Sequence, residues 1–122
     1  NSRIDRRLQL ERLCNDYKWL AKESNAAVVL ASQLNRQLEY RGTNVRPQLS
    51  DLAESGAIEQ VAENVFFTYY DYKVNPLKGL GKDKLQIVAS KVRYGDTGDV
   101  MLKFEGDKCK ISEDYDGKVN HL

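Results

Sequence analysis

The sequence predicts an α/β fold that ends in an antiparallel hairpin. Apolar residues recur every three or four positions over residues 2–24, which is the spacing of one helix face. Residues 26–31 then form an unbroken apolar run with two valines, as expected of a strand buried on both faces of a parallel sheet. Residues 85–92 and 100–104 have strand composition and flank the turn Gly95-Asp-Thr-Gly98. A helix followed by a buried strand is the order of an α/β fold.

The composition is that of an ordinary globular domain. The chain has 122 residues, a net charge of +1, 30% charged and 41% hydrophobic residues, enough for one domain with one core. No apolar run approaches the roughly 20 residues of a membrane span. Four of the first seven residues are charged and no apolar segment follows them, unlike a secretory leader, and the chain starts at Asn1 rather than methionine. We therefore expect an excised piece of a cytoplasmic protein with no membrane contact.

The predicted helix over residues 2–24 carries two apolar stripes. The broader stripe is expected to pack on the core and consists of Leu10, Leu13, Cys14, Tyr17, Leu20 and Ala21. The thinner stripe points elsewhere, either toward another part of the fold or toward a second subunit, and consists of Ile4, Leu8 and Trp19. Ser2 and Asp5 have the spacing of a helix-capping pair.

The middle of the chain alternates loops with short elements. Residues 37–50 are polar and predict a loop, after which Ser50 is placed to cap a short turn that Gly56 ends. Residues 57–62 can resume a helix. Residues 64–70 are rich in strand-forming side chains and predict a second buried strand.

The C-terminal third predicts a loop and further strands. Residues 71–83 contain proline, glycines and lysines and predict a loop. Alternation along residues 100–105 predicts a strand with one face in water. A short strand is expected at 108–112, and residues 113–122 are expected to form a flexible tail.

Cysteine, histidine and glycine patterns exclude several chemistries. Cys14 and Cys109 are far apart without metal-type spacing, so we expect reduced thiols, with a redox pair as the alternative. His121 has no second ligand beside it, so no metal site is expected. The Gly79-Leu-Gly-Lys82 run has the wrong spacing for a phosphate-binding loop. The chain on its own is therefore expected not to hydrolyse a nucleotide.

Three groups of residues remain as candidates for ligand contact. Gln33 follows the apolar run, where an amide could orient a water or contact a phosphate, or simply cap a strand. Gly56 offers backbone donors to a phosphate within a segment near Arg46, or belongs to an ordinary surface turn. Lys91 and Arg93 alternate on a strand and suit an anion or a solvated edge.

Taken together and in this order, these segments resemble the ATPase domain of DnaB-type replicative helicases, from about Arg3 to Ile111. The resemblance rests on Ser32-Gln-Leu-Asn-Arg36, on the run from Arg46 to Gln60, and on Lys91-Val-Arg93 with its two following glycines. It implies a RecA-like, mainly parallel sheet with flanking helices and a C-terminal antiparallel hairpin extension. Residues 1–112 would be a partial domain, truncated on its N-terminal side.

The resemblance assigns roles by motif. Gln33 would sense the γ-phosphate of ATP. Lys91 and Arg93 would reach a neighbouring subunit's ATP, with Arg93 as the arginine finger, so that these three are the implied catalytic and nucleotide-binding residues. The implied contacts with single-stranded DNA are Arg46, Glu54, Ser55 and Gly56.

The whole protein is then implied to be a homo-hexameric helicase that uses ATP and Mg²⁺ in a bacterial or phage-infected cell. Primase or a helicase loader is an implied partner. The family's phosphate loop, catalytic glutamate and magnesium aspartate would all lie upstream of this chain, so tight cofactor binding by the chain itself is not expected. The strands at 26–31 and 64–70 would lose the strand between them, and either leave a slot or pair directly.

The sequence departs from the family at three positions. Ala53 stands where many members carry a basic residue, Ser90 replaces a common glycine, and Tyr94 replaces a common asparagine. Two other functions stay open: a RecA-like DNA-binding, recombination or regulatory module without motor activity, and a purely structural interaction domain.

Overall fold

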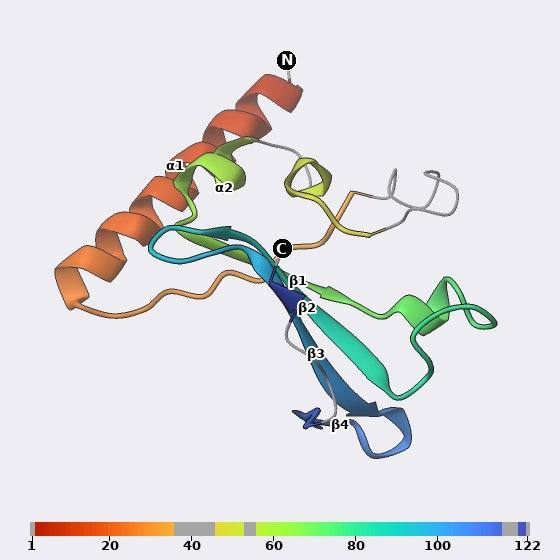
Figure 1. Ribbon diagram of the computed structural model, residues 1–122. Coiled ribbons are helices and arrows are strands. Elements are labelled where there is room, and N and C mark those ends of the chain that lie inside the picture. The colour runs from red at the N-terminus through yellow and green to blue at the C-terminus, as the bar shows by residue number, and fades with distance from the viewer. Residues whose placement is uncertain (1, 36–45, 53–55, 116–119, 122) are drawn as a thin grey trace.

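A long helix and a short one cover one side of an antiparallel sheet. The computed structural model describes residues 2–35, 46–52, 56–115 and 120–121. Helix α1 spans Ser2–Ser24, as predicted, and lies beside the six-residue helix α2, Gly56–Val61. Both lie against the sheet formed by the following strands (Figure 1). The strands are β1 (Asn64–Tyr69), β2 (Lys84–Val92), β3 (Gly98–Glu105), β4 (Lys110–Glu113) and β5 (Asn120–His121).

The sheet is a meander in the order β1-β2-β3-β4, with β5 paired to the start of β3. Every strand pair among the described residues is antiparallel, so the expected mainly parallel sheet is not what this part of the chain forms. The connections from β2 to β3 and from β3 to β4 are only a few residues long. Parallel pairing would need crossovers of about a dozen residues, so local connection length decides the strand direction in these two pairs. The hairpin extension is confirmed.

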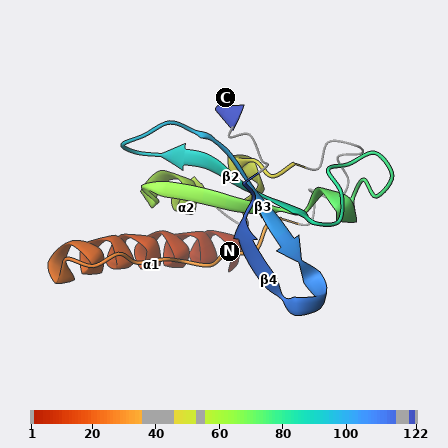
Figure 2. The ribbon, with the colours of Figure 1, turned by 60° about the horizontal axis from the view of Figure 1, so that its bottom comes forward.

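The apolar run at residues 26–31 is not a strand. The chain leaves α1 and passes back toward the sheet without regular structure (Figure 2). Val29 is 93% exposed and Val28 and Leu30 are also exposed. A strand needs a hydrogen-bonded neighbour. Within the described residues the nearest bridge joins Leu34, three residues beyond this segment, to Leu52. The prediction of a buried strand was therefore wrong for the chain as it stands.

Strand β1 has one buried face rather than two. Val65 and Phe67 are buried, whereas Phe66 between them is 60% exposed. Within the described residues β1 pairs with β2 alone, so direct pairing of the 26–31 and 64–70 segments does not occur. The single-sided burial follows from the antiparallel layout, in which only one face of the sheet is covered by helices.

The core lies between the helices and that face. Its buried members include Cys14 of α1, Ile58 of α2, Phe67 of β1 and Val88 of β2. The buried side of α1 is narrower than predicted, because Leu13, Tyr17 and Leu20 are exposed. The thinner stripe is exposed as well, with Ile4, Leu8 and Trp19 each more than half exposed. Helix α2 is only about 9 Å long by its residue count, so it covers only part of α1.

The connection from β1 to β2 is organised by one carboxylate. Asp71 accepts hydrogen bonds from the Tyr69 hydroxyl at 3.0 Å, the Asn75 amide at 2.9 Å and the Leu80 backbone N–H at 2.9 Å. A side chain at Gly79 would place its Cβ 2.1 Å from Asp71 Oδ2. Gly79 therefore allows the close packing of this loop around Asp71.

Both cysteines are free thiols, Cys14 buried and Cys109 exposed, so the alternative of a redox pair is not what the chain forms. In the described part of the chain no group of His, Cys, Asp or Glu could hold a metal ion. Within the same ranges, no helix has the length and apolar composition to cross a membrane.

Candidate functional site

Gln33 lies in the segment after α1, just before the residues that contact Asp51 and Leu52. Its side chain is exposed and follows Ser32, whose hydroxyl donates to the Gln33 carbonyl at 3.3 Å. One residue later, Leu34 forms the bridge to Leu52. The N–H of Asn35 donates to the Asp51 carbonyl at 2.7 Å. The predicted sensor residue is therefore joined through the backbone to the segment in which the predicted DNA contacts begin.

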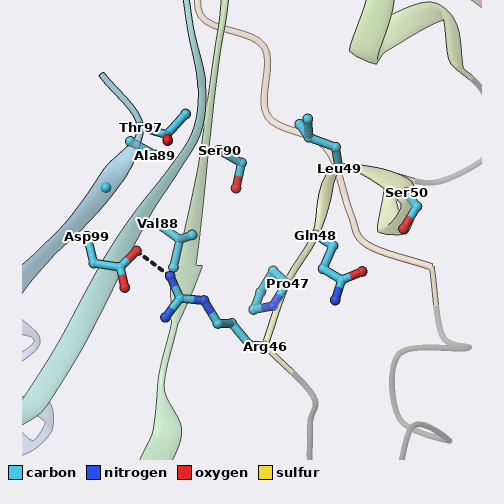
Figure 3. Close-up of a pocket in the computed structure, with 11 residues that line it drawn as sticks. Arg46, Pro47, Gln48, Leu49, Ser50, Val88, Ala89, Ser90, Thr97 and Asp99 are labelled. Carbon is cyan, nitrogen blue, oxygen red and sulfur yellow. Dashed lines mark hydrogen bonds and ion pairs between the residues drawn. The ribbon is translucent and has the colours of Figure 1, made fainter. Parts of the chain in front are cut away.

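The segment from Arg46 to Leu52 is held at both ends. Arg46 forms an ion pair with Asp99 of β3 (Figure 3), and Leu52 is buried in the core. Between them the chain makes one 3-10 turn, Leu49–Asp51. The predicted cap was wrong, because Ser50 lies inside the turn and is exposed. The Asp51 carboxylate caps instead, accepting the Gln48 N–H at 2.7 Å.

Gly56 is the first residue of helix α2. Glu54 and Ser55 lie outside the described residues, as does Ala53. Gly56 itself is exposed, and a Cβ there would meet only the Gln60 amide at 3.9 Å. The space in front of this glycine is therefore open to a ligand as well as to a small side chain.

Lys91 and Arg93 both bind the region of α2. Lys91 Nζ donates to the Glu59 carbonyl at 2.6 Å, and the Arg93 guanidinium pairs with Glu63 at 2.5 Å. The Arg93 backbone N–H donates to Asn64 Oδ1 at 3.2 Å. The two cations therefore lie on one side of the hairpin, as predicted. Arg93 stands just beyond the end of β2 and has an acidic partner that its neighbours in sequence did not reveal.

The Arg93 ion pair is accessible to solvent. The side chains of Arg93 and Glu63 are 48% and 41% exposed, and the guanidinium lies 5.1 Å from the centre of the Tyr94 ring. Pairs this exposed contribute about 0–1 kcal/mol. A more strongly binding anion could therefore displace Glu63 from Arg93 with little loss of free energy.

Two hollows flank Leu49. One has a volume of about 430 Å³ and lies between the Arg46–Ser50 segment and the β2–β3 hairpin (Figure 3). The other, about 440 Å³, is lined by Leu49, Gly56, Glu59, Gln60 and Lys91. The second hollow brings together Gly56 and Lys91, which belong to two motifs far apart in the sequence. Gln33 lines neither hollow.

Three long-range contacts of basic side chains in this region were not predicted from the sequence. The Asp99 carboxylate binds Arg46, the Glu59 carbonyl binds Lys91, and the Glu63 carboxylate binds Arg93. The partners are 53, 32 and 30 residues apart in sequence. No local pattern marks them, since each contact depends on how the hairpin packs against the region of α2 or against the Arg46–Ser50 segment.

Comparison with solved structures places this fold in a class, the ATPase domains of DnaB-like helicases. One solved structure, described as an ATPase domain, superposes with a TM-score of 0.83 and 34% identity, over 88% of this chain and 37% of that one. A DnaB-like replicative helicase, described together with its interactions with primase, gives a TM-score of 0.82 and 34% identity, over 88% of this chain and 26% of that one.

Residues 1–113 match the family described as the DnaB-like helicase C terminal domain, and the chain belongs to this family. The replicative DNA helicase DnaB of Haemophilus influenzae is 44% identical over 102 residues, which cover 84% of this chain and 21% of the relative. That of Buchnera aphidicola subsp. Acyrthosiphon pisum is 39% identical over 117 residues, covering 93% and 24%. The chain thus spans about a fifth to a quarter of these relatives.

Proposed function

We propose that this chain is the part of an ATP-dependent replicative DNA helicase that carries its nucleotide sensor, its DNA-contacting loop and its arginine finger. The complete protein would be a homo-hexamer that moves along single-stranded DNA and unwinds duplex. The observation that carries the proposal is the hollow that Gly56 and Lys91 line together. Glu59 lines it as well, and its carbonyl accepts a 2.6 Å hydrogen bond from Lys91 Nζ.

In this proposal the DNA strand is bound through its phosphates. Arg46, Glu54, Ser55 and Gly56 belong to the stretch that runs from residue 46 to the first residue of α2, where backbone donors and one guanidinium can face a phosphate chain. Such contacts do not read sequence and weaken with salt. Glu54 cannot neutralise a phosphate, so its role would be to orient neighbouring donors.

ATP and Mg²⁺ would bind between subunits of the complete protein. Gln33 would contact the γ-phosphate from one side, and its backbone link to residues 51–52 offers a route to the DNA segment. Lys91 and Arg93 would approach a neighbouring subunit's ATP, where a finger arginine accelerates phosphoryl transfer by about 10³–10⁵ in related systems. Because the sequence has no phosphate loop, we expect no ATP turnover from this chain alone.

The proposed partners are those that the relatives suggest. One solved relative is described with primase, which supports primase as a partner, and a helicase loader is a further candidate. The bacterial relatives support action in a bacterial or phage-infected cytoplasm.

The first experiment measures binding of the chain to a labelled oligothymidylate across a salt series. Gly56→Val is the informative variant, because the helix start accepts a side chain while a branched one would block a phosphate from the backbone. We expect affinity to fall steeply with salt and to drop with Gly56→Val.

The matched control is Gly56→Ala, which adds the smaller side chain and should bind with intermediate affinity. Both variants should keep the melting temperature of the parent chain. Salt-independent binding, or equal binding by all three proteins, would refute the phosphate contact at Gly56.

A further inference from the structure

Arg46, the candidate DNA contact, is engaged by an acid within the chain itself. Its guanidinium pairs with the Asp99 carboxylate across the hollow between the 46–50 segment and the hairpin (Figure 3). Asp99 lies on β3 directly opposite Val88 of β2, the strand that continues to Lys91. The pair therefore joins the start of the DNA segment to the hairpin that carries the proposed arginine finger.

The two members of this pair are buried unequally. The Asp99 side chain is 13% exposed and the Arg46 side chain 36% exposed. A carboxylate withdrawn from water needs a compensating partner, whereas a guanidinium at the surface can be solvated or can change partner. Arg46 is thus the member that can leave, and Asp99 the member that holds it.

The segment behind Arg46 has few other attachments before the core. Gln48 and Ser50 are exposed, and the 2.7 Å bond from Gln48 N–H to the Asp51 carboxylate lies within the turn. The Asp51 carbonyl, at the end of the turn, accepts the Asn35 N–H at 2.7 Å. Pro47, Asp51 and Leu52 are buried. Release of Arg46 would therefore remove the ion pair that joins the start of the segment to the hairpin, while the end of the segment stays attached through Asp51 and Leu52.

We propose that Asp99 is a positioning residue for DNA binding: it holds Arg46 on the β2–β3 hairpin, and a DNA phosphate must displace it to bind Arg46. The inference rests on the proposed function, since it takes Arg46 as a phosphate contact. DNA binding then weakens the tie between the 46–52 segment and the hairpin. The hairpin thereby senses an occupied DNA segment.

A double-mutant cycle with Asp99→Asn and Arg46→Gln tests the proposal on the full chain. Asparagine keeps the size of residue 99 and removes its charge, so Arg46 is no longer held. We expect Asp99→Asn to tighten binding to oligothymidylate about three- to tenfold at low salt. In the Arg46→Gln background the same change should have less than about a twofold effect, because there is no guanidinium to release.

Asp96→Asn is the matched control for charge. Asp96 is exposed on the same hairpin, three positions before Asp99, and its removal changes the net charge equally. The proposal is overturned if Asp96→Asn tightens binding as much as Asp99→Asn does, or if Asp99→Asn acts equally in both backgrounds. Either result would mean that the loss of one negative charge, and not the release of Arg46, strengthens DNA binding.

Hydrogen exchange supplies a second readout that needs no DNA. Asp99→Asn should speed exchange of the backbone amides from Gln48 to Ser50, whereas those of Asp51 and Leu52 should change little and the melting temperature should show the chain still folded. Unchanged exchange overturns the positioning role whatever the DNA result. If the wild-type chain binds DNA and Arg46→Gln binds equally well, the Arg46 contact of the proposed function fails and this inference with it. If the wild-type chain does not bind, the DNA contact fails altogether.

Discussion

Lys91 Nζ donates a hydrogen bond of 2.6 Å to the backbone carbonyl of Glu59 and thereby joins β2 to α2. The two residues are 32 positions apart. Lys91 and Glu59 line the hollow that Gly56 also lines, so the bond ties the hairpin to the helix that follows the proposed DNA-contacting segment. The Lys91 side chain therefore makes a structural contact within this chain and is also proposed to approach the ATP of a neighbouring subunit.

Replacing Lys91 with methionine should lower the stability of the chain. The substitution keeps the aliphatic length and removes a charged donor to a carbonyl, which costs about 1–2 kcal/mol in unfolding free energy. Urea unfolding followed by circular dichroism measures it. Lys103→Met, at an exposed position of β3, is the control and should be nearly neutral. Equal losses in the two variants would contradict the structural role of Lys91.

Asp71 should make stability depend on acid pH. The hydrogen bond from the Asn75 side chain lowers the pKa of Asp71; burial opposes this, and bonds from the Leu80 amide and the Tyr69 hydroxyl add to the lowering. A depressed pKa in the folded state means that the carboxylate stabilises the fold above the unfolded pKa of about 3.9. This contribution is lost as the pH falls through the folded pKa.

Urea unfolding between pH 2 and 7 should therefore show a loss of stability below about pH 4, and Asp71→Asn should reduce this loss. The same variant should be less stable than the parent at pH 7, because it loses the charge that orders the loop. Asp107→Asn, at an exposed site, should leave the profile unchanged. An identical profile for Asp71→Asn and the parent would show that Asp71 does not carry this dependence.

Gly79→Ala should destabilise the loop before β2. Its Cβ would lie 2.1 Å from the Asp71 carboxylate and 2.5 Å from the Asn75 carbonyl oxygen, and the latter is backbone that cannot rotate away. Overpacking of this kind costs about 1–3 kcal/mol. Thermal unfolding measures the loss, with Gly56→Ala as the control, since that position has space. A melting temperature equal to that of the parent would contradict the tight approach.

The two thiols should differ sharply in reactivity. Burial raises the pKa of Cys14, and less thiolate is then present at neutral pH. Cys109 is exposed and should react with a thiol reagent at once, whereas Cys14 should react only as the chain unfolds. A time course with and without urea gives both rates, and Cys109→Ser should remove the fast phase alone. Two fast phases in the folded chain would show that Cys14 is not protected.

Local pattern was sufficient for most elements. The helix at residues 2–24, the short helix and the β2–β3 hairpin were predicted close to their observed bounds. Helical periodicity and turn chemistry are properties of neighbouring residues, so they can be read without the fold. The run at 26–31 misled because its composition suits a strand, while forming one depends on a neighbouring strand that the described residues do not supply.

The sequence by itself determined the extents of the helices and hairpin, the order of the motifs around Gln33, Gly56 and Lys91, and the lack of a phosphate loop. Only the tertiary structure decided that β1 pairs antiparallel with β2 across a long connection, and which partners the cations have: Arg46 with Asp99, and Arg93 with Glu63. The physical reason is distance along the chain. Residue type and short spacing are local, whereas an ion pair between residues 30 or 53 positions apart exists only once packing has brought them together.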